Sequence, residues 1–204
     1  MITAAPERID LGEGAEILVW ERAFSEDETR SLTERLMREI PWQQREILIM
    51  GRRVMQPRLV CWVGDPEAEY TYSGIRNVPF TWQDVTSELR RSVEKITETA
   101  FNSVLLNLYR DERDSMGFHQ DNEKELGNEP IIASLSLGAT RRFQLRHAKK
   151  KGVPGRDLAL GDGSLILMRG TIQRLWRHGV PKESSPRGPR INLTFRTIYP
   201  TKPG

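Results

Sequence analysis

Two of the three histidines in the 204-residue chain lie where they could bind a metal ion together with an aspartate. His119 and Asp121 are two positions apart, so on an extended segment both side chains point to the same face. His178 follows after several predicted strands. Two histidines and one carboxylate on one face of an octahedron are typical of non-haem iron(II) oxygenases, whose open positions take a chelating co-substrate and dioxygen. Taken alone, the His-x-Asp pair indicates a surface hydrogen bond and His178 a structural histidine, so the prediction depends on their surroundings.

The segment that follows His178 predicts a strand with one polar face. Positions 191, 193 and 195 are apolar, and the opposite face carries Arg190, Asn192, Thr194 and Arg196. Two arginines on an inward face are costly to bury without anionic partners. A dicarboxylate would satisfy them, because a guanidinium binds a carboxylate through two parallel hydrogen bonds. The alternative is the exposed polar face of an edge strand.

A second polar pair, Asn107 and Tyr109, lies on a predicted strand shortly before His119. These two side chains are also two positions apart and therefore share a face. An amide and a phenol at this place could complete the hydrogen bonding of a bound acid. The alternative is a satisfied polar pair beside the core.

Helices are predicted in the first half of the chain and short strands in the second. Ser25 and Glu28 have the spacing of a capping box, and the apolar stripe that follows ends at Pro41. A second amphipathic helix is predicted to start near Thr81. Between the helices, a hairpin is predicted over residues 46–63 with its turn at Gly51. From residue 103 onward, short strands alternate with turn signals such as residues 161–163, which predicts a mainly β fold with a helical buttress.

The composition favours a globular protein. Hydrophobic residues are 37% and charged residues 29% of the chain, and no apolar run approaches the ~20 residues that span a bilayer. The single cysteine, Cys61, fits a reducing compartment, and the first residues do not resemble a secretory signal, so we expect a cytoplasmic location and no membrane association. Basic residues gather in segments 45–58 and 141–156, which could follow a phosphate backbone, although a charge run alone is more often a solvated face.

Five segments follow one another in the order seen in AlkB-type dioxygenases, and together they make the chain resemble that family. The segments are NLYRD at 107–111, HQDNE at 119–123, PIIASLSLGA at 130–139, HGVP at 178–181 and RINLTFR at 190–196. The resemblance extends from about Trp42 to Pro200. It is closest to the animal AlkB homologues that repair alkylated nucleic acid.

This resemblance implies a fold and an activity. The fold would be a double-stranded β-helix, or jelly roll, with an N-terminal nucleotide-recognition extension. Residues 1–204 would form a single domain, with helices and nucleotide-recognition hairpins in 1–100 and the catalytic core in 101–204. The activity would be oxidative demethylation of N-alkylated bases such as 1-methyladenine and 3-methylcytosine in DNA or RNA. It would use Fe(II), 2-oxoglutarate and O2, and would release formaldehyde, succinate and CO2.

The resemblance also implies roles for individual residues. His119, Asp121 and His178 would hold the iron. Arg190 would bind the remote carboxylate of 2-oxoglutarate with help from Tyr109. The rest of that pocket would consist of Asn107, Asn192, Thr194 and Arg196, although Arg196 could instead support the metal ligands.

Substrate contacts are expected in the extension and beside the metal site. Tyr72 would stack on the base opposite His119, within a segment that also contains Tyr70 and Thr71. Trp42 matches a substrate-side aromatic of the family, and a core tryptophan at the helix end is nearly as good an interpretation. The hairpin tip Met50-Gly51-Arg52 matches a probing loop, and the lysine-rich loop 147–155 would contact phosphates.

Two departures from the family pattern bear on the substrate. Met50 is less rigid than the aromatic residue of strong duplex probers, which favours single strands. Asn122 stands where relatives often have a carboxylate, so Glu123 would have to supply the negative charge for a cationic methylated base.

We expect a monomer. The alternatives are a 2-oxoglutarate oxygenase acting on protein or lipid, and a non-catalytic reader of alkylated nucleic acid; the basic segments argue against the first, and the complete ligand set against the second.

Overall fold

The computed structural model describes residues 5–49, 51–68, 70–72 and 75–199, and all structural statements below concern these residues. Helix α1 (Glu26–Glu39) begins with the predicted capping box: the Ser25 hydroxyl accepts a hydrogen bond from the backbone N–H of Glu28, and the Glu28 carboxylate accepts one from the backbone N–H of Ser25. Helix α2 (Asp84–Thr97) starts three residues after Thr81, with Gln83 as its N-cap. The shorter helices are α3 (Ile172–Leu175) and the 3₁₀ turn η1 (Lys124–Leu126).

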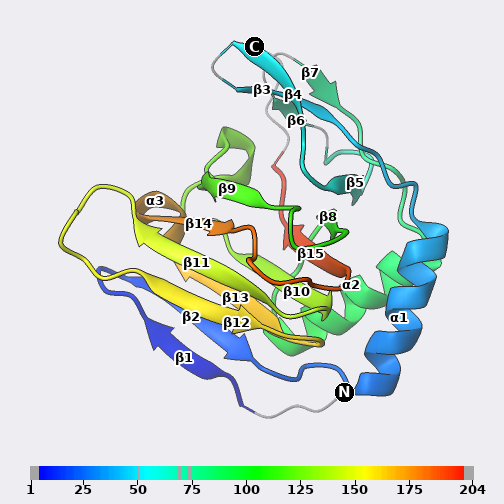
Figure 1. The fold of residues 1–204 in the computed structure, drawn as a ribbon, viewed down its shortest axis with the longest axis horizontal. Coiled ribbons are helices and arrows are strands. Elements are labelled where there is room, and N and C mark those ends of the chain that lie inside the picture. The colour runs from blue at the N-terminus through cyan, green and yellow to red at the C-terminus, as the bar shows by residue number, and fades with distance from the viewer. Residues whose placement is uncertain (1–4, 50, 69, 73–74, 200–204) are drawn as a thin grey trace.

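Two antiparallel sheets form the body of the molecule (Figure 1). The large sheet has the order β1-β2-β13-β10-β15-β8-β5. Its strands are β1 (Glu7–Asp10), β2 (Ala15–Trp20), β5 (Leu59–Gly64), β8 (Ser103–Tyr109), β10 (Ile132–Gly138), β13 (Leu165–Gly170) and β15 (Arg190–Arg196). The small sheet has the order β12-β11-β14-β9 and consists of β9 (Met116–His119), β11 (Arg141–His147), β12 (Arg156–Leu160) and β14 (Trp176–Val180).

From β8 onward the chain passes back and forth between the two sheets, which is the jelly-roll arrangement predicted from the sequence. The turn at residues 161–163 shows this crossing clearly. It joins β12 of the small sheet to β13 of the large sheet, so it links the layers and does not close a hairpin. Gly163 has φ +73° and its Cα lies so close to the Phe24 carbonyl that a Cβ would stand 2.8 Å from it, which explains a glycine at this position.

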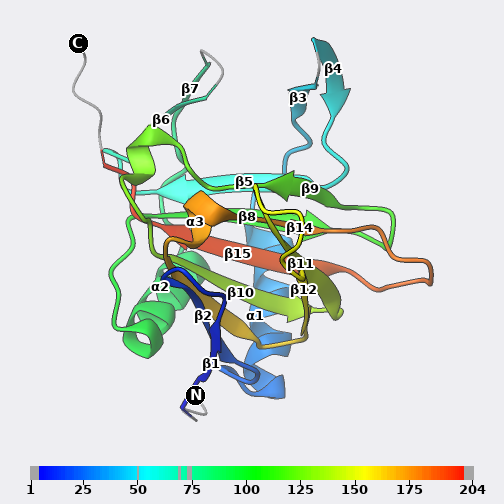
Figure 2. The same ribbon diagram turned by 90° about the vertical axis from the view of Figure 1, so that its left-hand side faces the viewer.

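Two small hairpins project from the body. One pairs β3 (Glu46–Ile49) with β4 (Arg52–Met55), and the other pairs β6 (Tyr70–Tyr72) with β7 (Ile75–Asn77). In both views they lie beyond strands β5 and β9, on the same side of the sheets (Figure 2). The predicted turn at Gly51 is confirmed, but the hairpin ends at Met55 and not at residue 63. The reason is that residues 59–64 form β5, which pairs with β8 in the large sheet.

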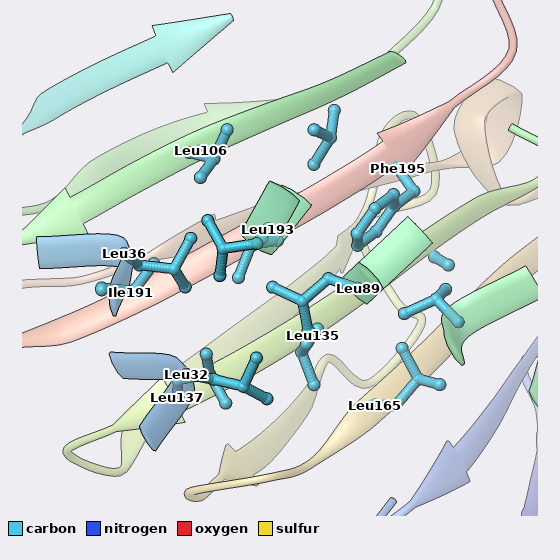
Figure 3. Packing of buried hydrophobic residues seen from close by; sticks show 14 of the residues in the cluster. Leu32, Leu36, Leu89, Leu106, Leu135, Leu137, Leu165, Ile191, Leu193 and Phe195 are labelled. Atoms are coloured by element: carbon cyan, nitrogen blue, oxygen red, sulfur yellow. The ribbon is translucent and has the colours of Figure 1, made fainter. Parts of the chain in front are cut away.

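Helices α1 and α2 cover the outer face of the large sheet and bury the main core against it. Leucines of α1 and α2 meet the apolar residues of the central strands, with Leu36, Leu89, Leu135 and Leu193 all fully buried (Figure 3). A second apolar cluster lies between the two sheets and includes Phe143, Leu145 and Trp176. Because β15 alternates strictly, its residues 191, 193 and 195 join the helix-facing core, and its polar residues face the small sheet.

The first hundred residues supply strands as well as helices and hairpins. Strands β1, β2 and β5 all belong to the large sheet, where β2 pairs with β13 and β5 pairs with β8. Within the described residues, no helix has the length and apolar character needed to cross a membrane.

Candidate active site

The structure brings His119, Asp121 and His178 together at the open edge of the small sheet. His119 ends β9 and lies directly opposite His178 of β14 in the strand register. Asp121 follows two residues after β9 and points back to the same face. One ligand atom of each residue lies within 4.8 Å of the others, with His119 Nε2 at 3.8 Å from Asp121 Oδ1 and His178 Nε2 at 3.7 Å from Asp121 Oδ2. A single ion can therefore reach all three side chains.

Asp121 is held in its ionised form. Its side chain is buried, and burial is the strongest single influence on its pKa, in the upward direction. The positive charge of Arg196, which also donates a hydrogen bond to this carboxylate, opposes burial, and the pKa of Asp121 lies below its usual value. Its Oδ2 is buried and has no hydrogen-bond partner. A buried carboxylate oxygen without a partner is unfavourable unless a cation binds it, which fits a metal ligand.

His178 is held in its neutral form, which is the form that binds metals. Burial, followed by the neighbouring His119, lowers the pKa of His178 to about 3. Its ring stacks on Phe143 at 5.3 Å between centroids and meets the His119 ring at 4.3 Å in an edge arrangement. These contacts fix the direction of the imidazole toward Asp121.

Two glutamine contacts fix the chain that carries Asp121. The buried Gln173 of α3 accepts a hydrogen bond from the Asp121 backbone N–H through its Oε1, at 3.1 Å. Gln120 donates through Nε2 to the Gln173 carbonyl at 3.0 Å. Gln173 was not identified from the sequence, because segment 172–176 also contains Arg174 and nothing there singles out the glutamine.

Arg190 lies at the bottom of a narrow cavity between the sheets, and it is only 1% exposed. Its Nη2 donates to the Ser136 hydroxyl at 2.9 Å, whereas Nε and Nη1 have no partner. Its Cζ lies 5.3 Å from the centre of the Tyr109 ring. Burial lowers the pKa of Arg190 to about 10. A buried guanidinium with two nitrogens unpartnered is suited to an incoming carboxylate, which is the chemistry predicted for the remote acid of 2-oxoglutarate.

The other residues predicted for the co-substrate line the same cavity, and three of them, Asn107, Asn192 and Thr194, make side-chain hydrogen bonds there. Asn192 donates to the Ser134 hydroxyl at 2.7 Å, and the Thr194 hydroxyl donates to Asn192 Oδ1 at 3.1 Å. Asn107 Oδ1 accepts a hydrogen bond of 2.7 Å from Nε of the buried Arg58, which stands beside β5. The complete lining of polar residues is Asn107, Tyr109, His119, Asp121, Ser134, His178, Arg190, Asn192, Thr194 and Arg196.

Arg58, Ser134 and Ser136 were not identified from the sequence. The serines lie on β10, whose alternate residues, Leu135 and Leu137, face the helices, so their inward direction is a consequence of strand periodicity. For Arg58 the sequence contains no comparable signal. It precedes β5 and reaches Asn107 only because β5 pairs with β8.

Arg196 contacts one of the three candidate metal ligands and also lines the cavity, so both roles predicted for it stay predictions. Its Nη2 donates to Asp121 Oδ1 at 2.8 Å, and both side chains are buried. The other carboxylate oxygen, Asp121 Oδ2, lies 3.7 Å from His178 Nε2 and has no hydrogen-bond partner.

The predicted substrate contacts fall into three groups. Glu123 has a buried Oε2 without a hydrogen-bond partner, and burial raises its pKa, whereas Asn122 is exposed. Trp42 packs against the main core and its Nε1 donates to the Leu36 carbonyl at 3.3 Å, so the structure gives it the helix-end role and a substrate contact stays a prediction. Met50 lies outside the described residues; Gly51 and Arg52 lie in the β3–β4 hairpin, and Tyr70, Thr71 and Tyr72 form β6.

Comparisons with known proteins agree with this geometry. The model of the 2OG-Fe(II) oxygenase superfamily matches residues 16–196. The alpha-ketoglutarate-dependent dioxygenase alkB homolog 3 of Homo sapiens is 44% identical over 184 residues, which cover 85% of this chain and 63% of that protein. The DNA oxidative demethylase ALKBH2 of Arabidopsis thaliana is 35% identical over 221 residues, which cover 95% and 70% respectively. The chain thus spans a little less than two thirds of the alkB homolog 3 relatives.

A solved structure gives the same fold. The structure of OsALKBH1 superimposes with a TM-score of 0.61, covering 94% of this chain and all of that one, at 16% sequence identity. Fold, site and family match together define a jelly-roll oxygenase of the non-haem iron type. The chain belongs to the 2OG-Fe(II) oxygenase superfamily, and its similarity to AlkB homologues confirms the resemblance seen in the sequence. Membership implies Fe(II), 2-oxoglutarate and O2 as the groups that the cavity receives.

Proposed function

We propose that this protein removes alkyl groups oxidatively from N-alkylated bases, such as 1-methyladenine and 3-methylcytosine, in DNA or RNA. The reaction consumes 2-oxoglutarate and O2 at Fe(II), and it releases formaldehyde, succinate and CO2. The observation that carries the proposal is the position of the half-buried His119 and the buried Asp121 and His178 in one cavity with Arg190, two of whose nitrogens lack hydrogen-bond partners. The relatives named DNA oxidative demethylase support a nucleic-acid substrate.

Iron(II), when bound with its co-substrate and O2, supplies the oxidation of the N-methyl carbon. The chain positions the ion and the co-substrate and sets the charges around them. His119, Asp121 and His178 hold the ion, and Arg196 keeps Asp121 ionised. Arg190 and Tyr109 hold the remote carboxylate of 2-oxoglutarate in the cavity, so the co-substrate binds in one orientation.

Recognition of the base is proposed for residues around the mouth of the site. A base has to leave its stack to reach the ion. Tyr72 in β6 is proposed to stack on it, with Tyr70 and Thr71 beside it. Glu123 is proposed to face a cationic methylated base, because a buried carboxylate that lacks a partner would be stabilised by that charge. Asn122, which is exposed, is proposed for an outer contact only.

Substrate binding and catalysis are proposed to belong to different parts of the structure, the projecting hairpins and the two sheets. The hairpins β3–β4 and β6–β7 bind the nucleic acid, and the two sheets, including strands from the first hundred residues, form the catalytic core of a single domain. Single strands are the preferred substrate, and the enzyme acts as a monomer in the cytoplasm.

The test is a demethylation assay. The protein is incubated with iron(II), 2-oxoglutarate, ascorbate and matched single-stranded or duplex oligonucleotides that contain 1-methyladenine or 3-methylcytosine, and the base mass and formaldehyde are followed. We expect the mass of one methyl group to disappear, fastest from single strands. If no oligonucleotide loses a methyl group while succinate still forms with a protein or lipid substrate, the nucleic-acid proposal is wrong.

A further inference from the structure

The outer face of the small sheet, turned away from the metal, combines an exposed aromatic ring with arginines. Residues His119, His178 and Leu145 point inward, so their neighbours in the same strands point outward. The outward neighbours are Phe118 of β9, Arg177 of β14, and Gln144 and Arg146 of β11. We refer to these four residues as the Phe118 face. The charged residues that the four strands direct outward are Arg142, Arg146, Asp157 and Arg177.

Phe118 is a large apolar residue that is 48% exposed, and it lies one residue before the end of β9. Arg146 Cζ lies 5.9 Å from the centre of its ring, which is within reach of a cation–π contact. An exposed ring on an edge strand buries little apolar area in folding, so nothing in the packing of the described residues accounts for it.

The arginines of the Phe118 face are partly fixed in place and partly free. Arg146 Nη1 is held by Asp157 Oδ1 at 2.7 Å and by the Leu145 carbonyl at 2.8 Å. Gly155 leaves room for this side chain, because a Cβ there would lie 2.3 Å from Arg146 Nη1. Arg177 is exposed and has no ion pair among the residues that the structure describes. The face therefore carries a positioned guanidinium and a free positive charge beside an exposed ring.

We propose that the Phe118 face binds single-stranded nucleic acid, namely the nucleotides next to the base that enters the cavity. One of those bases stacks on Phe118, and Arg177 contacts a phosphate. Sheets that bind single strands use this combination, because every base has a flat face that stacks on an aromatic ring and the backbone is attracted to positive charge. The assignment to flanking nucleotides rests on the proposed demethylase function.

Position and charge favour a nucleic acid over a protein partner. Phe118 directly precedes the candidate metal ligand His119 at the edge of β9. When the target base of a single-stranded nucleic acid passes this edge to enter the cavity, the next nucleotides are within reach of the outer face. The apolar part of the face is one ring, which is too little for a stable protein interface of ordinary size. The outward charges of the sheet are three arginines and one aspartate. Asp157 pairs with Arg146 and Glu183 pairs with Arg142, so Arg177 is the outward arginine that has no ion pair among the described residues.

The test measures binding apart from turnover. Fluorescence anisotropy with an unmethylated, labelled single strand of roughly 15 nucleotides, near the upper end of site sizes on such surfaces, reports binding. We expect Phe118→Ala to weaken this binding about tenfold, in line with the loss of one base–aromatic stack, whereas Phe118→Trp retains it. Arg177→Ala is expected to reduce the slope of log K against log salt by about 0.7, the value for one phosphate contact on a single strand.

Matched controls lie on α1. Met37 has an exposure of 45%, similar to that of Phe118, and Arg38 is likewise exposed, so Met37→Ala and Arg38→Ala are expected to leave binding unchanged. A further readout is the ratio of kcat/KM for the long strand to that for a methylated trinucleotide, which we expect to fall about tenfold in Phe118→Ala if the lost contact is one base stack.

The outcomes separate this inference from the proposed function. Unchanged binding of the long strand by Phe118→Ala overturns the inference. So does an equal loss of kcat on long and short substrates together with weakened metal binding, because that result means the variant disturbs His119. If no oligonucleotide is demethylated but Phe118→Ala still weakens single-strand binding, the proposed function fails and the binding surface stands.

Discussion

Arg196 and Asp121 are 75 positions apart in the chain, and a hydrogen bond of 2.8 Å joins Nη2 of the first to Oδ1 of the second at the metal site. The bond connects the last strand of the large sheet, β15, with the segment that follows β9 of the small sheet. Because both groups are buried and oppositely charged, each makes the burial of the other possible. This ion pair thus links the two sheets beside the candidate metal ligands.

Loss of Arg196 is expected to weaken metal binding. Arg196→Met removes the partner of Asp121 Oδ1 and lets burial raise the pKa of that carboxyl, and supporting partners of this kind typically contribute 10- to 100-fold in metal affinity. Calorimetric titration with Mn²⁺, which does not oxidise as iron(II) does, measures the effect, and Arg196→Lys should retain part of the affinity. Unchanged affinity in Arg196→Met would mean that Arg196 does not act through Asp121.

Loss of Asp121 is expected to separate turnover from nucleic-acid binding. Asp121→Ala removes one of three candidate ligands but lies inside the cavity, away from the hairpins. We therefore expect oligonucleotide binding to persist while demethylation stops. Asp27→Ala, which changes a carboxylate that is 91% exposed on α1, is the control and should behave as the wild type. Full activity of Asp121→Ala would show that the metal assignment is wrong.

Loss of Arg190 is expected to weaken the binding of 2-oxoglutarate without lowering the stability of the fold. Without a dicarboxylate, Nε and Nη1 of this buried group lack partners, so Arg190→Met should not lower the free energy of unfolding. With Mn²⁺ present, 2-oxoglutarate at a hundredfold excess over its Kd should stabilise the wild type by about 2.7 kcal/mol, and should have little effect on the variant. Thermal denaturation measures both, with Arg38→Met as the exposed control; an equal gain in the variant would contradict the role of Arg190.

Cys61 is expected to be unreactive while the protein is folded. The thiol is fully buried, and burial raises its pKa to about 12, so thiolate is scarce at pH 8. Because Cys61 is the single cysteine, one maleimide label counts unfolded molecules directly. We expect labelling to follow the unfolding curve in urea, with almost none in the native protein. Rapid labelling before unfolding would show that β5 opens locally.

The sequence by itself determined the local features and the faces of strands. The Ser25–Glu28 capping box, the strict alternation in residues 190–196 and the shared face of Asn107 and Tyr109 all depend on neighbours in the chain, and all three are present in the structure. The order of motifs was also sufficient to predict the jelly roll and the family. These features could be predicted because helix and strand periods fix the direction of a side chain relative to its own element.

Only the tertiary structure decided which groups meet. Residues 161–163 lead from one sheet to the other, β5 leaves the predicted hairpin to pair with β8, and Arg58 consequently reaches Asn107. Trp42 bonds to the end of α1, and Arg196, which lines the cavity, pairs with Asp121. Periodicity shows that a side chain points inward, but its partner depends on the pairing of strands that are far apart in the chain, and the balance of burial and charge follows from that pairing.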